Sequence, residues 1–347
     1  MPGKDRDGLE KDFAIRLKPQ HGILESPLVQ RAWVFQEQIL SPRIIHFAPG
    51  EMYWECKSHV SCECTGWEKR SETLELATRQ RKAHTQLVGK TQTLRNFSIQ
   101  SSEKELKRDL EAYEELVERY TAMNITKDFD CLPALSGITS GREDEYLAGI
   151  WRSLLIPSLH WMPKKSDNHK ITYRPEQYRA PSWSWASIQG PIQHLHQPSY
   201  KRDKKDMAFA NVVSAVCTPE GKDPRGRVVS GYLKMQGQAV TAVVKGLGIR
   251  KSPGEGESDT FADLVCGRLA VQCHLDIPLV IGMMQPSEAV IDMQVLLLRI
   301  SAFAALVLSG IEDTPGAYRR IGIFSISDVK GKETIWDYAQ NTSVFIW

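Results

Sequence analysis

Four potential metal ligands lie close together in the first part of the chain. Cys56, His59, Cys62 and Cys64 follow the spacing C-x2-H-x2-C-x-C, and thiolates and imidazoles are the groups that hold zinc in tetrahedral sites. The final C-x-C spacing is shorter than that of typical zinc pairs, and no second cluster of such residues accompanies it. We therefore expect ordinary thiols at these positions, with no metal and no cofactor.

Glu37 is a carboxylate with an indole and a cation as neighbours. It follows Trp33 by four residues, so on a helix the carboxylate and the indole lie side by side, and Arg43 is a nearby cation in the sequence. The structural interpretation is that Trp33 anchors the core while Glu37 pairs with Arg31, Arg43 or a backbone amide.

Trp183 and Trp185 alternate around Ser184, so on a strand their indoles would face the same side. A pair of indoles could bind a sugar or a nucleobase by stacking. Large aromatic side chains more often fill the core, and we expect that role for this pair.

Composition and missing motifs narrow the class of protein. The 347-residue sequence holds no G-x-S-x-G nucleophile elbow, no G-x-x-x-x-G-K-[ST] phosphate loop and no H-E-x-x-H zinc helix, so nothing in it demands an enzyme. A net charge of +2 predicts no general attraction to nucleic acid or to an anionic membrane. Seven cysteines, an odd number, follow a polar N-terminus that is no signal peptide, which favours reduced thiols in the cytosol. We expect a cytoplasmic protein that does not enter a membrane.

The elements that must position Glu37 are a helix and a hairpin. Ser26 can cap a helix that begins at Pro27, and Leu28, Ala32, Phe35 and Ile39 recur on one apolar face of it. Ser41-Pro42 ends the helix, because the residue before a proline avoids the helical conformation. The sequence then predicts strands over Arg43–Phe47 and Met52–Cys56, with Ile45 and Phe47 on the same face as Trp54.

Further along, helical patterns give way to β-rich ones. The capping box Ser102-x-x-Glu105 predicts a helix over Glu103–Met123. A second helix is expected at about Glu143–Leu155, with Leu147, Ile150, Trp151 and Leu154 on its inner face. From about Met207 short apolar runs alternate with Gly/Pro loops, which is typical of an antiparallel sandwich or barrel. The predicted strands are Phe209–Cys217, Gly231–Met235, Ala239–Val244, Leu269–Leu275, Met293–Ile300, Phe303–Leu308 and Tyr318–Ser325, with a flexible loop over residues 246–259.

The predicted fold class is α+β. We expect a helix-plus-hairpin region over residues 1–70, a helical region over residues 71–165 and a β-rich domain over residues 166–347.

Four segments of the chain resemble the HET (heterokaryon incompatibility) proteins of filamentous fungi. Arg31–Cys56 is similar to R-x-W-x-x-Q-E-x-x-L-S-x-R-x-x-x-F followed by Y-W-E-C, and Asp130–Ile138 to D-R-L-P-A-L-S-G-I. Tyr178–Ser187 is similar to Y-x-A-P-S-W-S-W-A-S, and Tyr318–Phe324 to Y-x-R-I-G-x-F. The family-motif residues are Trp33, Gln36, Glu37, Ser41, Arg43, Phe47, Tyr53, Trp54, Glu55, Cys56, Pro181, Trp183 and Trp185.

The resemblance implies a role in non-self recognition between hyphae and in the programmed cell death that follows. Such a protein is expected to act by regulated interaction with protein partners of an incompatibility system or with further copies of itself. HET domains have been compared with TIR domains, so an alternative is an NAD nucleosidase that uses Glu37.

The sequence also departs from the family pattern. Cys131 stands where the family has arginine, and the Y-x-W-G and I-D-x-x-C-I-x-Q segments that begin the HET domain do not occur. Residues 1–70 are therefore expected to be the C-terminal portion of a HET domain, and an inactive truncated remnant is a further alternative.

Overall fold

The computed structural model describes residues 2–4, 10–12, 27–48, 51–56, 60–62, 90, 94, 102–164, 172–195, 209–251, 258–267, 269–277, 292–325 and 335–347. The chain divides into two compact units. One comprises Met1–Gln30 and Ser41–Gln86, and the other comprises Arg31–Leu40 and Leu87–Trp347. Of the region over residues 71–165 that the sequence predicts to be helical, residues 71–100 lie outside the described residues except for positions 90 and 94.

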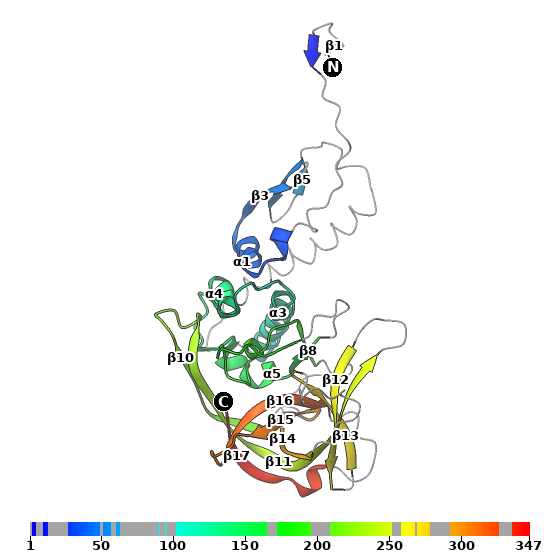
Figure 1. Ribbon diagram of the computed structural model, residues 1–347. Helices are drawn as coiled ribbons and strands as arrows, with labels where there is room; N and C mark the ends of the chain where they lie inside the picture. Colours follow the sequence, from blue (N-terminus) through cyan, green and yellow to red (C-terminus); the bar gives the residue numbers. More distant parts are fainter. Residues whose placement is uncertain are drawn as a thin grey trace. The chain divides into compact units, whose positions relative to one another are not determined.

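The first unit is built from short antiparallel strands. β1 (Pro2–Lys4) pairs with β2 (Glu10–Asp12), and β3 (Arg43–Ala48), β4 (Glu51–Cys56) and β5 (Val60–Cys62) form a three-stranded sheet (Figure 1).

The register of the β3–β4 hairpin confirms the prediction. Ile45 lies opposite Trp54, and Phe47 lies opposite Met52, so these side chains share one face of the sheet.

The helix before this hairpin belongs to the second unit. The prediction placed its start at Pro27, but residues Pro27–Gln30 form a 3-10 turn, η2, and the α-helix α1 runs over Ala32–Leu40. Ala32, Phe35 and Ile39 are buried as the spacing predicted, whereas Leu28 in the 3-10 turn is exposed.

The predicted capping box begins the longest helix that the structure describes. α3 runs over Glu103–Thr121, the Ser102 hydroxyl accepts a hydrogen bond from the Glu105 backbone amide, and the Glu105 carboxylate accepts one from the Ser102 amide at 2.7 Å. A further helix, α4 (Pro133–Thr139), was not predicted. Its proline stands at the start, where the missing amide hydrogen costs nothing.

The predicted helix at Glu143–Leu155 is wrong. A tight hairpin of β6 (Tyr146–Leu147) and β7 (Ile150–Trp151) stands there, followed by the 3-10 helix η4 (Arg152–Leu154) and α5 (Leu155–Ser158). The turn uses left-handed backbone at Ala148 and Gly149, with φ of 46° and 102°, which no α-helix accommodates. Leu147, Ile150, Trp151 and Leu154 are still buried, as the helical spacing required.

The β-rich region is a closed barrel with an additional hairpin arm. Its strands are β10 (Ala210–Pro219), β11 (Val228–Lys251), β12 (Ser258–Cys266), β13 (Leu269–Leu275), β14 (Met293–Arg299), β15 (Ala304–Gly310), β16 (Ala317–Ser325) and β17 (Gln340–Ile346). The order β11-β12-β13-β16-β15-β14 returns to β11 through antiparallel pairs at every step, and this closes the ring. The chain is therefore α+β, and the barrel form of the predicted β-rich region is the one adopted.

Two of the strand predictions need correction. Gly231–Met235 and Ala239–Val244 belong to one long strand, β11. The two ends of the predicted loop over residues 246–259 are strands, because β11 pairs with β12 as far as Lys251 opposite Ser258, and residues 252–257 lie outside the described residues. Strand β17, which the prediction missed, pairs with β11 and β16. Within the described residues no helix is long and apolar enough to cross a membrane.

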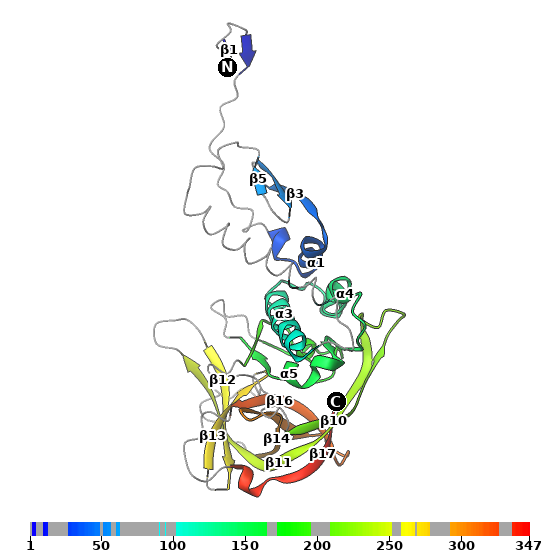
Figure 2. The ribbon, with the colours of Figure 1, turned by 180° about the vertical axis from the view of Figure 1, so that it is seen from behind.

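Arg225 lies in the turn of the β10–β11 hairpin, which extends alongside the helices in both ribbon views (Figures 1 and 2). Its guanidinium donates from Nε to the carbonyl of Thr139 at 3.1 Å and from Nη2 to that of Arg142 at 3.2 Å, which ties the hairpin to the helical region.

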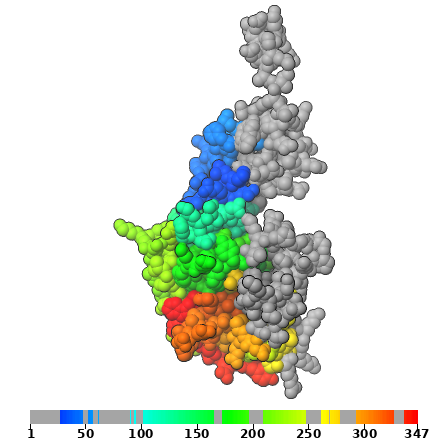
Figure 3. All heavy atoms as spheres, viewed as in Figure 1, coloured from blue at the N-terminus to red at the C-terminus, as the bar shows by residue number. Residues whose placement is uncertain are grey.

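One hydrophobic core joins the helices to the barrel. Residues of α3, α4, the β6–β7 hairpin and the outer sides of β11, β14 and β15 form a single cluster, while a second cluster fills the inside of the barrel. In Figure 3 the green atoms of the helical region adjoin the orange and red atoms of the barrel. The helical region and the barrel thus belong to the same compact unit.

Candidate functional site

Two family-motif side chains fasten α1 to the segment that contains α4. Trp33 Nε1 donates a hydrogen bond to Asp130 Oδ2 at 3.0 Å, and the backbone amide of Gly137 donates to Gln36 Oε1 at 2.6 Å. A Cβ at position 137 would lie 2.7 Å from Gln36 Oε1, so the Gln36 side chain would have to move to accept any larger residue there. The contact therefore joins two segments that are about a hundred residues apart in the sequence.

The structural interpretation of the sequence placed Trp33 in the core, but its side chain lies at the surface. Its side chain is 38% exposed and is hydrogen-bonded to Asp130, three residues before the start of α4. The structure supports a role in which the Trp33 side chain joins two helical segments through a hydrogen bond.

Glu37, the candidate catalytic residue, is exposed on α1. Among the described residues of its unit it forms no ion pair, and it lines neither of the two pockets described below. A general acid or base needs a reacting group held within hydrogen-bond distance. Neither of these two pockets holds a reacting group next to Glu37.

The hairpin carries a buried aromatic residue and an ion pair. Tyr53 is buried, and Glu55 Oε2 lies 2.8 Å from His46 Nε2 across the two strands. The motif residues Arg43, Phe47 and Trp54 are exposed, while Ser41 and Cys56 are half-buried. Phe47 is the most exposed large hydrophobic side chain in the described part of the chain, at 80%.

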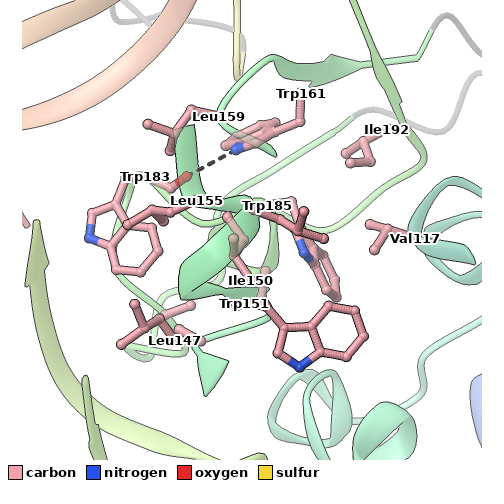
Figure 4. Packing of buried hydrophobic residues seen from close by; sticks show 14 of the residues in the cluster. Val117, Leu147, Ile150, Trp151, Leu155, Leu159, Trp161, Trp183, Trp185 and Ile192 are labelled. Atoms are coloured by element: carbon pink, nitrogen blue, oxygen red, sulfur yellow. Dashed lines mark hydrogen bonds between the residues drawn. The ribbon is translucent and has the colours of Figure 1, made fainter. Parts of the chain in front are cut away.

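The tryptophans of the Tyr178–Ser187 segment are core residues, as expected. Pro181, Trp183 and Trp185 are buried, although they lie in turns and in the 3-10 helix η5 (Trp185–Ser187) rather than on a strand. Figure 4 shows both indoles among apolar side chains, with Trp161 Nε1 donating to the Trp183 carbonyl at 3.0 Å. Their faces are covered, so they form no stacking platform for a ligand.

The hydrogen bonds of Trp185 also explain its position. Its Nε1 donates to the Tyr113 hydroxyl at 2.9 Å and to the Gly149 carbonyl at 3.2 Å, and the Tyr113 hydroxyl donates to the same carbonyl. Burial raises the pKa of Tyr113 well above its usual value, so the hydroxyl stays protonated and can donate.

The structure describes only two of the four residues weighed as metal ligands and expected to bind none. Cys56 and Cys62 lie on β4 and β5, whereas His59 and Cys64 fall outside the described residues. The described residues contain no group of three side chains able to hold a metal ion. Burial raises the pKa of Cys217 and of Cys273 to about 12, so these thiols are poor nucleophiles at neutral pH.

Two buried arginines escaped the sequence analysis. Arg320, in the segment that resembles Y-x-R-I-G-x-F, binds both carboxylate oxygens of Asp276 at 3.1 and 3.2 Å. It also donates to the carbonyls of Leu159 and Trp161, which ties β16 to the helical region. Arg142 likewise pairs with Asp109 at 2.8 Å. The family pattern marked position 320 but supplied no reason for it.

A groove that sequence reasoning missed lies in the second unit. Two adjoining pockets, with volumes of about 920 and 330 Å³, share the segment that runs from Arg174 to Arg179. The larger pocket is bordered by Lys127–Phe129 and Arg227–Val229, and the smaller one by Arg319 and Trp347. The sequence signal was a cluster of arginine and tyrosine just before the Ala180-Pro181 motif, and the partners on β11 and β16 could not be inferred from it.

Comparisons with family models, with curated proteins and with solved structures found no match to this chain.

Proposed function

We propose that this chain is a HET-domain protein that acts by regulated protein interaction in fungal non-self recognition and the cell death that follows. In this role the domain changes state on contact with a partner and signals by association.

The contact between α1 and the α4 segment is the observation that carries the proposal. Trp33 and Gln36 come from one family-like segment, and Asp130 and Gly137 come from another. A chance likeness of letters gives no reason for the matching positions of two distant segments to bond to each other. A shared ancestral packing does give such a reason.

The surface of the hairpin favours interaction over catalysis. Ile45 is 58% exposed and Phe47 is 80% exposed, and they lie on the same face of the sheet. Exposed apolar side chains grouped in this way are typical of protein-binding surfaces. Glu37, by contrast, lines neither of the two pockets described above.

A cell-death assay in a filamentous fungus tests the proposal. The chain is overexpressed as the native sequence, as Phe47→Ser and as Glu37→Ala, with protein levels measured in each strain. Tyr338→Ser, which alters another exposed aromatic residue, is the matched control. We expect death from the native chain, from Glu37→Ala and from Tyr338→Ser, and a marked loss of killing by Phe47→Ser.

Two results would contradict the proposal. Loss of killing in Glu37→Ala at unchanged protein level would point to the NAD-cleaving alternative and would call for an NAD hydrolysis assay. Absence of killing by a well-expressed native chain would favour an inactive remnant.

A further inference from the structure

The groove around Arg174–Arg179 carries more positive than negative charge. Its described lining includes the cations Lys127, Arg174, Arg179, Arg227 and Arg319 and the carboxylates Asp128, Glu176 and Glu220. The question is which of these charges already have partners within the protein.

Two of the arginines are committed to the fold. Arg179 is buried, donates to the Ala186 carbonyl at 2.6 Å and lies 3.9 Å from the carboxylate of Asp128. Arg227 lies 3.5 Å from Glu220 and stacks on Phe129. These side chains shape the groove, and their donors are used.

Arg174 differs from both. It is half-buried, and among the described residues it makes one long hydrogen bond, from Nη2 to the Arg320 carbonyl at 3.5 Å. Burial lowers its pKa, the carboxylate of Asp276 opposes this, and the positive charges of Arg319, Arg320 and Arg179 lower the pKa further. Asp276 is itself bound through both oxygens by Arg320.

Arg319 lies beside Arg174 in the smaller pocket and is exposed. In the described part of the chain it forms no ion pair. Two guanidinium groups therefore border one pocket, and most of their N–H donors are available. An unpaired cation is costly to bury, so the half-buried Arg174 would be stabilised by a bound anion.

The rest of the lining indicates what the anion is attached to. Guanidinium groups bind phosphate through paired hydrogen bonds, and two of them together suit a doubly charged phosphate. Tyr178 and Trp347 line the same pocket, are 52% and 44% exposed, and offer ring faces for stacking. Glu176 is exposed to solvent, where its repulsion of an anion is screened.

We propose that this groove binds a small phosphorylated molecule that carries a planar ring, with Arg174 and Arg319 as the phosphate contacts and Tyr178 and Trp347 beside the ring. The volumes of the two pockets fit the range of small-molecule sites in proteins. This site is separate from the hairpin surface on which the proposed function depends, so either proposal can fail alone.

Calorimetric titration of the full chain tests the site. The probes are AMP, which has both groups, pyrophosphate, which has only the phosphates, and adenosine, which has only the ring. We expect AMP to bind more tightly than pyrophosphate and adenosine not to bind detectably. AMP affinity should rise between pH 5 and pH 7.5, because a phosphomonoester gains its second negative charge near pH 6.

Variants then assign the contacts. Arg319→Gln should weaken AMP binding roughly tenfold, since a charge-assisted hydrogen bond is lost. Arg108→Gln on α3, another exposed arginine that lines neither pocket, should leave AMP binding unchanged. Arg174→Gln should abolish binding while the thermal unfolding midpoint stays near that of the native chain.

No AMP binding by the native chain, or equal binding by Arg319→Gln, would overturn the proposal. Equal affinities for AMP and pyrophosphate would overturn the part that assigns a ring to the ligand.

Discussion

At the scale of single residues, the family-motif tryptophans fall into two groups that the sequence motifs do not distinguish. Trp183 and Trp185 are buried among apolar side chains, whereas Trp33 is partly exposed and held by one hydrogen bond to Asp130. The free energy of unfolding should therefore respond differently to the loss of each side chain.

We expect Trp183→Ala to cost about 3–5 kcal/mol of stability, because it opens a large cavity in the core. Trp33→Ala should cost about 1–2 kcal/mol, since less apolar area and one hydrogen bond are lost. Urea denaturation followed by circular dichroism measures both values. Equal losses would place Trp33 in the core and contradict the description of its surface position.

At the scale of elements, the tight β6–β7 hairpin depends on a glycine for two reasons. Gly149 has a φ of +102°, and a Cβ there would lie 3.0 Å from the ring of Trp185. Gly316 also has a positive φ, of +80°, but a Cβ there would meet no atom within 4 Å. A comparison of alanine substitutions at the two positions therefore separates the cost of backbone strain from the cost of steric crowding.

Gly316→Ala should cost about 1 kcal/mol from strain alone. Gly149→Ala should cost about 1–3 kcal/mol more, because the indole must shift in a close-packed core. Thermal unfolding of the two variants, side by side, gives the comparison. If Gly149→Ala were no worse than Gly316→Ala, the Trp185 contact would not constrain the turn.

At the scale of the whole second unit, Arg320 connects the barrel to the helical region. Its guanidinium is fully buried and reaches Asp276 beyond the end of β13, the carbonyl of Leu159 just after α5, and the carbonyl of Trp161 in the short strand β8 (Trp161–Pro163). Loss of one partner of a buried ion pair leaves the other charge uncompensated.

Arg320→Met should therefore destabilise the unit by about 3–5 kcal/mol. It should also reduce amide-hydrogen protection in α3 and in β14 together, because both belong to one shared core. Hydrogen exchange with mass spectrometry reads both elements in one experiment. The double variant Arg320→Met with Asp276→Leu should recover much of the lost stability. Faster hydrogen exchange in β14 without any change in α3 would contradict a shared core.

Elements with strong local signals were predictable from the sequence. The capping box at Ser102–Glu105 begins α3 because both bonds form within one turn of chain, and the β3–β4 hairpin follows from two short apolar runs around a loop. The spacing of Leu147, Ile150 and Trp151 identified buried residues but not their element. The tight hairpin places Leu147 opposite Ile150 and Tyr146 opposite Trp151, and all four side chains are buried, so the burial pattern alone did not decide between a helix and a hairpin.

The sequence by itself determined the α+β class, the location of α3 and of the hairpin, and the burial of Trp183 and Trp185, because these depend on local bonding and on apolar character. Only the tertiary structure decided that the β-rich region closes as a barrel, since closure depends on pairing between β11 and β14 about fifty residues apart. It also brought Arg174 next to Arg319 from separate segments. Charges that lie far apart in the chain acquire partners, or lack them, only after the strands between them have paired.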